Sequence, residues 1–124
     1  MKIQNFRTEE QTDTKRVLAT IVWEDCNRPK QDIYFATSRA FSEALSCNPH
    51  AFLVAGILPA MRSGEERVFI EADICPELAE GLATVMALLR HWYDPSRKLV
   101  RIEPSGWFKS VSPCKRERAG FFFS

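Results

Sequence analysis

The sequence predicts a small α+β domain, in which a mixed sheet is covered by two main helices and an apolar strand stands at the end of the chain. Two longer stretches carry helix start signals and helical spacing of apolar residues. With 124 residues, 45% of them apolar and 27% charged, the chain is long enough for one hydrophobic core. Short runs rich in β-branched and aromatic residues, typical of strands, occur at 16–25, 32–37, 67–74 and 99–104.

The first half of the chain predicts a β-hairpin. Residues 1–16 are polar and weakly patterned, so no element is assigned there. The run RVLATIVWED at 16–25 alternates as a strand does, and DIYFAT at 32–37 reads as a second strand. Between them, NRPKQ at 27–31 contains Pro29 and predicts a turn.

Two helices are expected next. Thr37 or Ser38 can cap a short helix over 39–46, because a hydroxyl oxygen accepts from the free amides of a first turn. Asn48 and Pro49 then form a stronger start signal, as N-cap and first helical residue. The helix that follows is apolar nearly all round, which favours a central, buried position.

That central helix has a defined end. Pro59 should kink it or tighten its last turn, since proline lacks the amide hydrogen that the helix needs. Gly64 is a natural residue to follow the helix, because it adopts a positive φ without steric cost.

The second half predicts strand, helix and strand. RVFIEADI at 67–74 is a strand, Pro76 opens a helix that runs to about Tyr93, and LVRIEP at 99–104 is the next strand. The expected order is therefore β-β-α-α-β-α-β. One face of the long helix should be buried, and its apolar residues are Leu78, Leu82, Val85, Leu89 and Trp92.

This pattern divides the chain into three parts. Residues 1–104 form the α+β domain, residues 105–118 read as a linker rich in Ser, Gly and Pro, and residues 119–124 read as one more strand. The last part, AGFFFS, is an apolar run without alternation, as in a parallel strand buried on both faces.

Charge and composition restrict the function classes. The net charge of +1 gives no general attraction to nucleic acid, and no apolar stretch is long enough to span a bilayer. The start of the chain lacks the apolar segment of a secretory signal. Four cysteines without a CxxC pair then favour reduced thiols and a cytoplasmic location.

A metal site is the first chemical hypothesis. Cys47 and His50 in CNPH, with Cys75 and His91, are the residue types that zinc prefers. The competing interpretation is structural, because a helix start already explains the Asn-Pro between Cys47 and His50, and cysteine is a common buried residue. We expect no metal site, with Cys47, His50 and Cys75 as the weak candidates. His91, in the last turn of a helix, is expected to interact with the helix dipole.

No catalytic apparatus is recognisable. Glu65, Glu66, Glu71 and Asp73 form an acidic group that a solvated loop and an outer strand face explain, and no nucleophile, base and orienting group can be assembled. The common nucleotide and hydrolase motifs are absent. A short basic patch is expected to be a solvated part of the linker: Lys115, Arg116 and Arg118.

The end of the chain resembles a known family. GFFFS at 120–124 is similar to the first strand of PP-loop ATP pyrophosphatases, in which a buried apolar strand is followed by Ser-Gly-Gly-x-Asp-Ser. In that family the loop binds the pyrophosphate of ATP at a helix N-terminus, and the enzyme adenylates a carbonyl or carboxylate. Ser124 is the one position that matches the loop, and the rest of the loop is absent.

The region before it adds to the resemblance. Residues 50–124 look like the amino-terminal domain that precedes the loop in a group of bacterial PP-loop proteins, with an apolar helix, a Met-Arg-x-Gly turn, a strand, a Pro-x-Leu helix and a strand. The resemblance implies a non-catalytic accessory domain that packs on a nucleotide-binding domain and has no ATP chemistry of its own. ATP would be the cofactor of the parent enzyme, and Ser124 would contact it only with the missing loop in place.

Two alternatives remain open. In the first, the chain is a complete interaction protein, whose C-terminal strand completes its own sheet or joins two copies in a homodimer. In the second it is a small metal protein that uses Cys47, His50 and Cys75.

Overall fold

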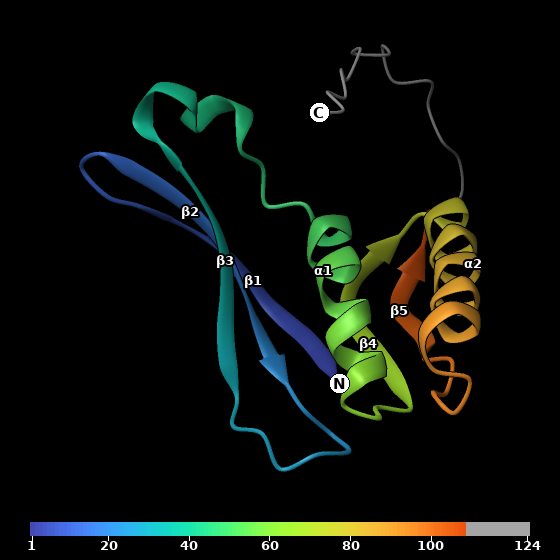
Figure 1. The fold of residues 1–124 in the computed structure, drawn as a ribbon. Coiled ribbons are helices and arrows are strands. Elements are labelled where there is room, and N and C mark those ends of the chain that lie inside the picture. Colours follow the sequence, from blue (N-terminus) through green and yellow to red (C-terminus); the bar gives the residue numbers. More distant parts are fainter. Residues whose placement is uncertain (109–124) are drawn as a thin grey trace.

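The computed structural model describes residues 1–108, and it confirms the α+β class: a five-stranded mixed sheet, in the order β3-β2-β1-β4-β5, carries two helices (Figure 1). The expected strand at 119–124, the basic patch, Ser124 and most of the expected linker lie outside the described residues. The elements are β1 (Lys2–Glu10), β2 (Thr14–Val22), β3 (Gln31–Ser38), the 3-10 helix η1 (Arg39–Ala44), α1 (Pro49–Arg62), β4 (Arg67–Ile74), α2 (Pro76–Tyr93) and β5 (Arg101–Trp107).

The expected element order was wrong at its start, because residues 2–10 form the central strand β1. This strand pairs antiparallel with β2 and parallel with β4, so it joins the two halves of the sheet. Its polar side chains face away from the helices, whereas Ile3 is fully buried in the core. The order is thus β-β-β before the first helix, and the short helix expected over 39–46 is the 3-10 helix η1.

A bulge in β1 explains why its sequence does not alternate. Two residues of β1, Asn5 and Phe6, lie opposite Ala19 alone in β2. Asn5 has a φ of 58°, in the left-handed region that asparagine tolerates better than most residues. The extra residue turns Phe6 towards the helices, where its ring contacts that of Phe52 at 5.5 Å. Beyond the bulge β1 no longer pairs with β4.

The predicted hairpin of β2 and β3 is confirmed. The two strands pair antiparallel from Thr14 with Ser38 to Ile21 with Gln31. The face of this hairpin opposite the helices is polar: Thr20 donates to Asp32 at 2.7 Å, and Arg7 from β1 donates to the same carboxylate at 2.5 Å. Hydrogen bonding to Thr20 and the nearby Arg7 lower the pKa of Asp32 below its usual value.

Helix α1 begins and ends as predicted. The Asn48 side chain accepts from the His50 amide at 3.0 Å, Pro49 opens the helix, and Gly64 follows its end with a φ of 75°. The expectation that α1 is buried all round was wrong. Its buried residues lie on the side towards the sheet, whereas Val54 and Leu58 are exposed, because the described residues cover one side only.

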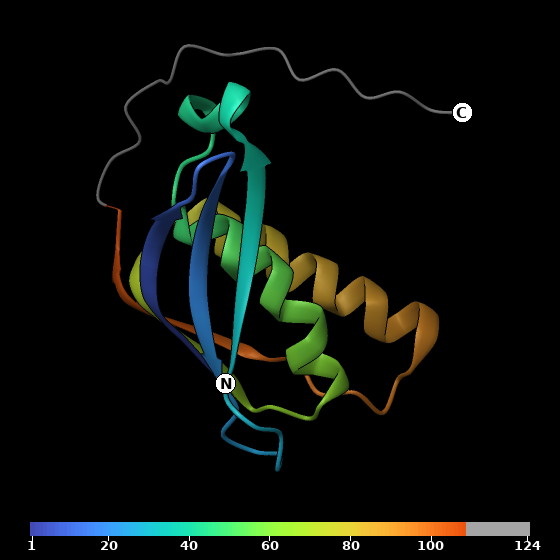
Figure 2. The ribbon, with the colours of Figure 1, turned by 90° about the vertical axis from the view of Figure 1, so that its left-hand side faces the viewer.

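Both helices lie on the same face of the sheet, behind the ribbon of β1, β2 and β3 in Figure 2. The core lies between them and the sheet. Strand β5 continues to Trp107, so residues 105–107, expected to begin a linker, belong to the sheet. The largest fully buried apolar side chains are Phe52, Met1, Ile3, Leu53, Ile57, Ile70, Ile74, Val17 and Val68.

Candidate docking surface

The structure brings two of the three metal candidates together. His50 lies in the first turn of α1, and Cys75 is the residue that precedes α2. The Cys75 amide donates to His50 Nε2 at 2.9 Å, which ties the beginnings of the two helices to each other. Cys47 lies apart from this pair, with its thiol 3.7 Å from the carbonyl oxygen of Arg7.

Both ring nitrogens of His50 have protein partners. Because Nε2 accepts a hydrogen bond, the neutral ring carries its proton on Nδ1, which lies 2.8 Å from Asn48 Oδ1 and donates to it. A metal ligand would need one of these nitrogens free. Within residues 1–108, no group of three or more His, Cys, Asp and Glu side chains could hold a metal ion. The geometry assigns His50 a structural role.

Two of the predicted acidic residues, Glu65 and Glu71, make contacts with backbone or N-terminal amino groups. Glu65 is buried, with 1% of its surface exposed, and it binds the Met1 ammonium group and the amides of Glu24 and Asp25. Glu71 accepts from the Asn5 amide at the bulge of β1. Glu65 and Glu71 therefore hold neighbouring segments of the chain in place.

An ion-pair network surrounds the start of the chain. Arg67 donates to both oxygens of Glu24, at 3.1 and 2.9 Å, and to Glu103 at 2.8 Å. The hydrogen bonds from Arg67 and from the Met1 ammonium lower the pKa of Glu24 to about 2. The same carboxylates raise the pKa of Arg67 above its usual value. This network fixes β4 to the end of β2 and the N-terminus.

Helix α2 is less buried than helix α1, which has six buried residues. Only Leu82 and Met86 of the 18 residues of α2 are buried. The apolar face predicted for this helix is divided: Leu78 and Leu89 are partly buried, while Val85 and Trp92 are exposed, Trp92 by 64%. Two of the five residues of the predicted apolar face are therefore exposed on the described part of the chain.

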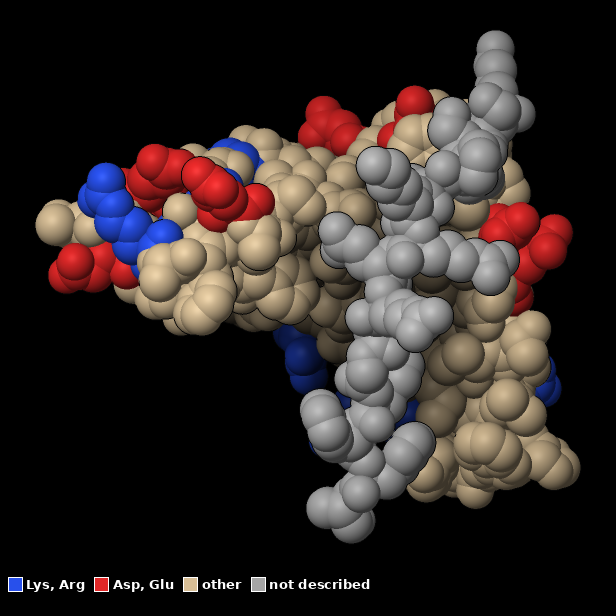
Figure 3. Space-filling model, turned by 90° about the horizontal axis from the view of Figure 1, so that it is seen from above, with Lys and Arg blue, Asp and Glu red and all other residues tan. Residues whose placement is uncertain are grey.

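The unpartnered residues form a continuous helical stripe. Val85, Leu88 and Trp92 follow each other at spacings of three and four, and Tyr93 and Leu99 extend the apolar area beyond the helix. We call these five residues the α2 surface. Seen from above in Figure 3, the α2 side of the molecule shows uncharged surface with acidic and basic side chains at its edge.

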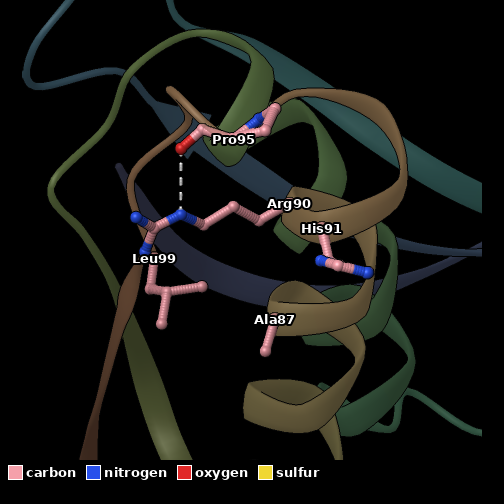
Figure 4. A pocket seen from close by; sticks show the side chains of 5 residues that line it. All are labelled: Ala87, Arg90, His91, Pro95 and Leu99. Carbon is pink, nitrogen blue, oxygen red and sulfur yellow. Dashed lines mark hydrogen bonds between the residues drawn. The ribbon is translucent and has the colours of Figure 1, made fainter.

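A shallow pocket of about 290 Å³ borders the α2 surface at the end of the helix (Figure 4). Arg90 reaches the loop after α2 and donates to the carbonyl oxygen of Pro95 at 3.1 Å, and the Leu99 side chain lies close to its guanidinium group. His91 projects in a different direction from Arg90 and is exposed. The residues that line the pocket are Ala87, Arg90, His91, Pro95 and Leu99, so His91 is the one possible general base in this lining.

A second hollow, of about 500 Å³, lies between α2 and β5. Ala83, Met86 and Val100 contribute apolar walls, and Glu80 and Arg101 stand at the rim. β5 is the last strand of the sheet, so one edge of it forms no ladder within the described residues. The hollow and the edge lie on the opposite flank of α2 from Val85 and Leu88.

Sequence reasoning identified Val85 and Trp92 of the α2 surface but assigned them to the buried face, and it did not identify Leu88, Tyr93 and Leu99. It missed three arginines from separate loops and helix ends, Arg28, Arg62 and Arg97, which line one cavity. Their spacing of more than thirty residues gives no local signal.

Comparisons of the chain with protein-family models, with curated proteins and with solved structures found no match. Among residues 1–108, no helix is both long enough and apolar enough to cross a membrane.

Proposed function

We propose that this chain is a non-catalytic accessory domain that packs against a nucleotide-binding domain through the α2 surface. The observation that carries the proposal is the stripe of Val85, Leu88 and Trp92, which is exposed on a helix of which two residues are buried. Contiguous apolar area of this kind marks an interaction site on a protein surface. Aromatic residues such as Trp92 and Tyr93 commonly anchor such interfaces.

The energetics of α2 support a packing partner. A helix of this length gains most of its stability from burial of its apolar face, because its hydrogen bonds exchange for bonds to water. Val85 and Leu88 are 44% and 41% exposed, so burial of what remains would add about 1 kcal/mol for each of them. The partner would thus complete the packing that the sheet begins with Leu82 and Met86.

The occupant we propose is a PP-loop domain of the same polypeptide, in the cytoplasm. The resemblance of residues 50–124 to the domain ahead of the PP-loop supports this choice, and GFFFS would be the first strand of that domain. ATP would belong to the parent enzyme. Ser124 would contact the nucleotide only with Gly-Gly-x-Asp-Ser behind it.

Calorimetry tests the absence of ATP chemistry. The chain and its Ser124→Ala variant are titrated with ATP and Mg²⁺, and ATP hydrolysis is followed in parallel. We expect neither hydrolysis nor any binding that Ser124→Ala abolishes. Stoichiometric binding that disappears in Ser124→Ala would contradict the proposal.

Hydrogen exchange tests the docking. The chain is compared alone and fused to a PP-loop domain, and exchange is measured for peptides of α2. Protection of residues 85–93 should rise in the fusion and should not rise when Leu88→Ser and Trp92→Ser are combined. Unchanged exchange would reject the docking. A doubled mass of the isolated chain, lost in the double variant, would instead assign the surface to a second copy.

A further inference from the structure

A cavity of about 320 Å³ lies where three separate segments meet. Arg28 comes from the β2–β3 loop, Arg62 from the last turn of α1, and Arg97 from the α2–β5 loop. These segments meet at the lower end of the molecule in Figure 1, away from the beginnings of the helices. The other lining residues are Leu58, Pro59 and Ser63, so no acidic side chain lines the cavity.

The donors around this cavity are incompletely satisfied. Within residues 1–108, neither Arg28 nor Arg62 has a carboxylate partner, and Arg97 uses only its Nε towards Asp94, at 3.3 Å. The Ser63 hydroxyl is buried and has no hydrogen-bond partner in the same range. An unpartnered buried hydroxyl is costly and needs an explanation, such as a bound group.

One arginine is held in place by a neighbour. The Arg28 guanidinium stacks over the ring of Trp23, with 5.1 Å from its carbon to the ring centroid. Trp23 is itself largely buried, and its Nε1–H has no partner among the described residues. Stacking fixes the plane of the guanidinium while its N–H groups stay free to bind an acceptor.

We propose that Arg28, Arg62, Arg97 and Ser63 form a binding site for a phosphate monoester. Guanidinium groups match the geometry of phosphate oxygens and donate two hydrogen bonds to one group. The apolar side chains of Leu58 and Pro59 offer contact to the organic part of the ligand. The volume is at the lower end of the roughly 300–1,000 Å³ of small-molecule sites, which suits a small phosphorylated metabolite.

The dipole of helix α1 opposes the binding of an anion in this cavity. The cavity borders the carboxyl end of that helix, where partial negative charge disfavours anions. That end carries about half an elementary charge, whereas three guanidinium groups carry a full positive charge each. Phosphate would also relieve the mutual repulsion of the three cations, so the charge balance favours binding.

Thermal unfolding and calorimetry with phenyl phosphate test the site. The ligand should raise the melting temperature of the chain, because it binds the folded state. Arg62→Gln and Arg28→Gln should each weaken binding by about tenfold, since each removes hydrogen bonds to a charged group. The control, Arg39→Gln, removes the same charge from η1 at another part of the molecule and should bind as the wild type does.

Ser63→Ala separates the site from a general electrostatic effect. Without ligand the variant should be as stable as the wild type or more stable, because an unpartnered buried hydroxyl is removed. With phenyl phosphate its gain in melting temperature should be smaller. Equal gains in both proteins, or equal losses of binding in Arg39→Gln and Arg62→Gln, would overturn the proposal, as would no effect of phenyl phosphate at millimolar concentration.

Two comparisons identify the source of the phosphate and keep this site distinct from the proposed function. Inorganic phosphate should bind more weakly than phenyl phosphate if Leu58 and Pro59 contact the ester group, and equal binding would reject the ester. ATP binding that persists in Ser124→Ala and is lost in Arg62→Gln would belong to this cavity. ATP binding that is lost in Ser124→Ala and unchanged in Arg62→Gln would contradict the accessory role.

Discussion

The α-amino group of Met1 is buried against the carboxylate of Glu65, with both side chains almost fully enclosed. The ammonium group also donates to Glu24 and to the carbonyl oxygen of Arg67, at 3.1 and 2.8 Å. Glu65 accepts in turn from the amides of Glu24 and Asp25. This relationship joins the N-terminus, the end of β2 and the beginning of β4 at one point.

Replacement of Glu65 should be severely destabilising. Glu65→Gln leaves a buried ammonium group without its main partner, which costs about 3–5 kcal/mol of unfolding free energy. Urea unfolding followed by circular dichroism measures the loss. The matched control is Glu66→Gln, because the exposed Glu66 takes part through its backbone amide. A Glu65→Gln variant as stable as this control would contradict the role of the ion pair.

Glu24 should make stability depend on acid pH. The folded-state pKa of Glu24 is lowered from 4.5 to about 2, so its contribution is present above pH 4.5 and is lost as the pH falls towards 2. We expect the free energy of unfolding to fall less steeply over this window in Glu24→Gln. Urea titrations at a series of pH values test this, with the exposed Glu43→Gln as the control. Parallel curves for Glu24→Gln and wild type would contradict the lowered pKa.

Two glycines in helices should respond in opposite directions to alanine. A Cβ atom at Gly56 would lie 2.9 Å from Cδ1 of the buried Ile3, whereas a Cβ at Gly81 would meet nothing within 4 Å. Gly56→Ala should therefore be destabilising by about 1 kcal/mol, because overpacking exceeds the gain in helix propensity. Gly81→Ala should stabilise by about 0.5–1 kcal/mol. A stabilising Gly56→Ala would contradict the close packing of α1 against Ile3 of β1.

Substitutions in α2 should separate stability from docking. Leu82→Ala removes one of the two buried residues of the helix and should cost about 2–5 kcal/mol. Leu88→Ser on the α2 surface should change the unfolding free energy of the isolated chain by less than about 0.5 kcal/mol. A large loss for Leu88→Ser would show that this residue packs inside the domain, and the α2 surface would then not be a docking site.

Local signals predicted much of the fold. Asn48 and Pro49 predict the start of α1, because helix capping depends on contacts within two or three residues. The runs of β-branched residues predict β2, β3 and β4. Strand β1 was not predicted, because the left-handed backbone conformation of Asn5 interrupts the alternation of its side chains and because its outer side chains are polar. Residue types alone do not show that a bulge restores the pattern at Phe6.

The candidate sites depend on tertiary relationships that no short stretch contains. The spacing of Val85, Leu88 and Trp92 shows that they share one side of a helix, but it does not show whether that side faces the sheet or a partner. His50 and Cys75 looked like metal ligands by type, and the structure joins them through a backbone amide instead. The arginine cavity arises only when two loops and a helix end converge.

The most direct measurement for the accessory role is to read the encoding DNA beyond codon 124 in all three frames. We expect codons for Gly-Gly-x-Asp-Ser directly after Ser124, in frame or one shift away, because GFFFS would be the first strand of a PP-loop domain. DNA that encodes nothing of this kind would contradict the assignment to that family. The α2 surface would then have to be explained by a different partner.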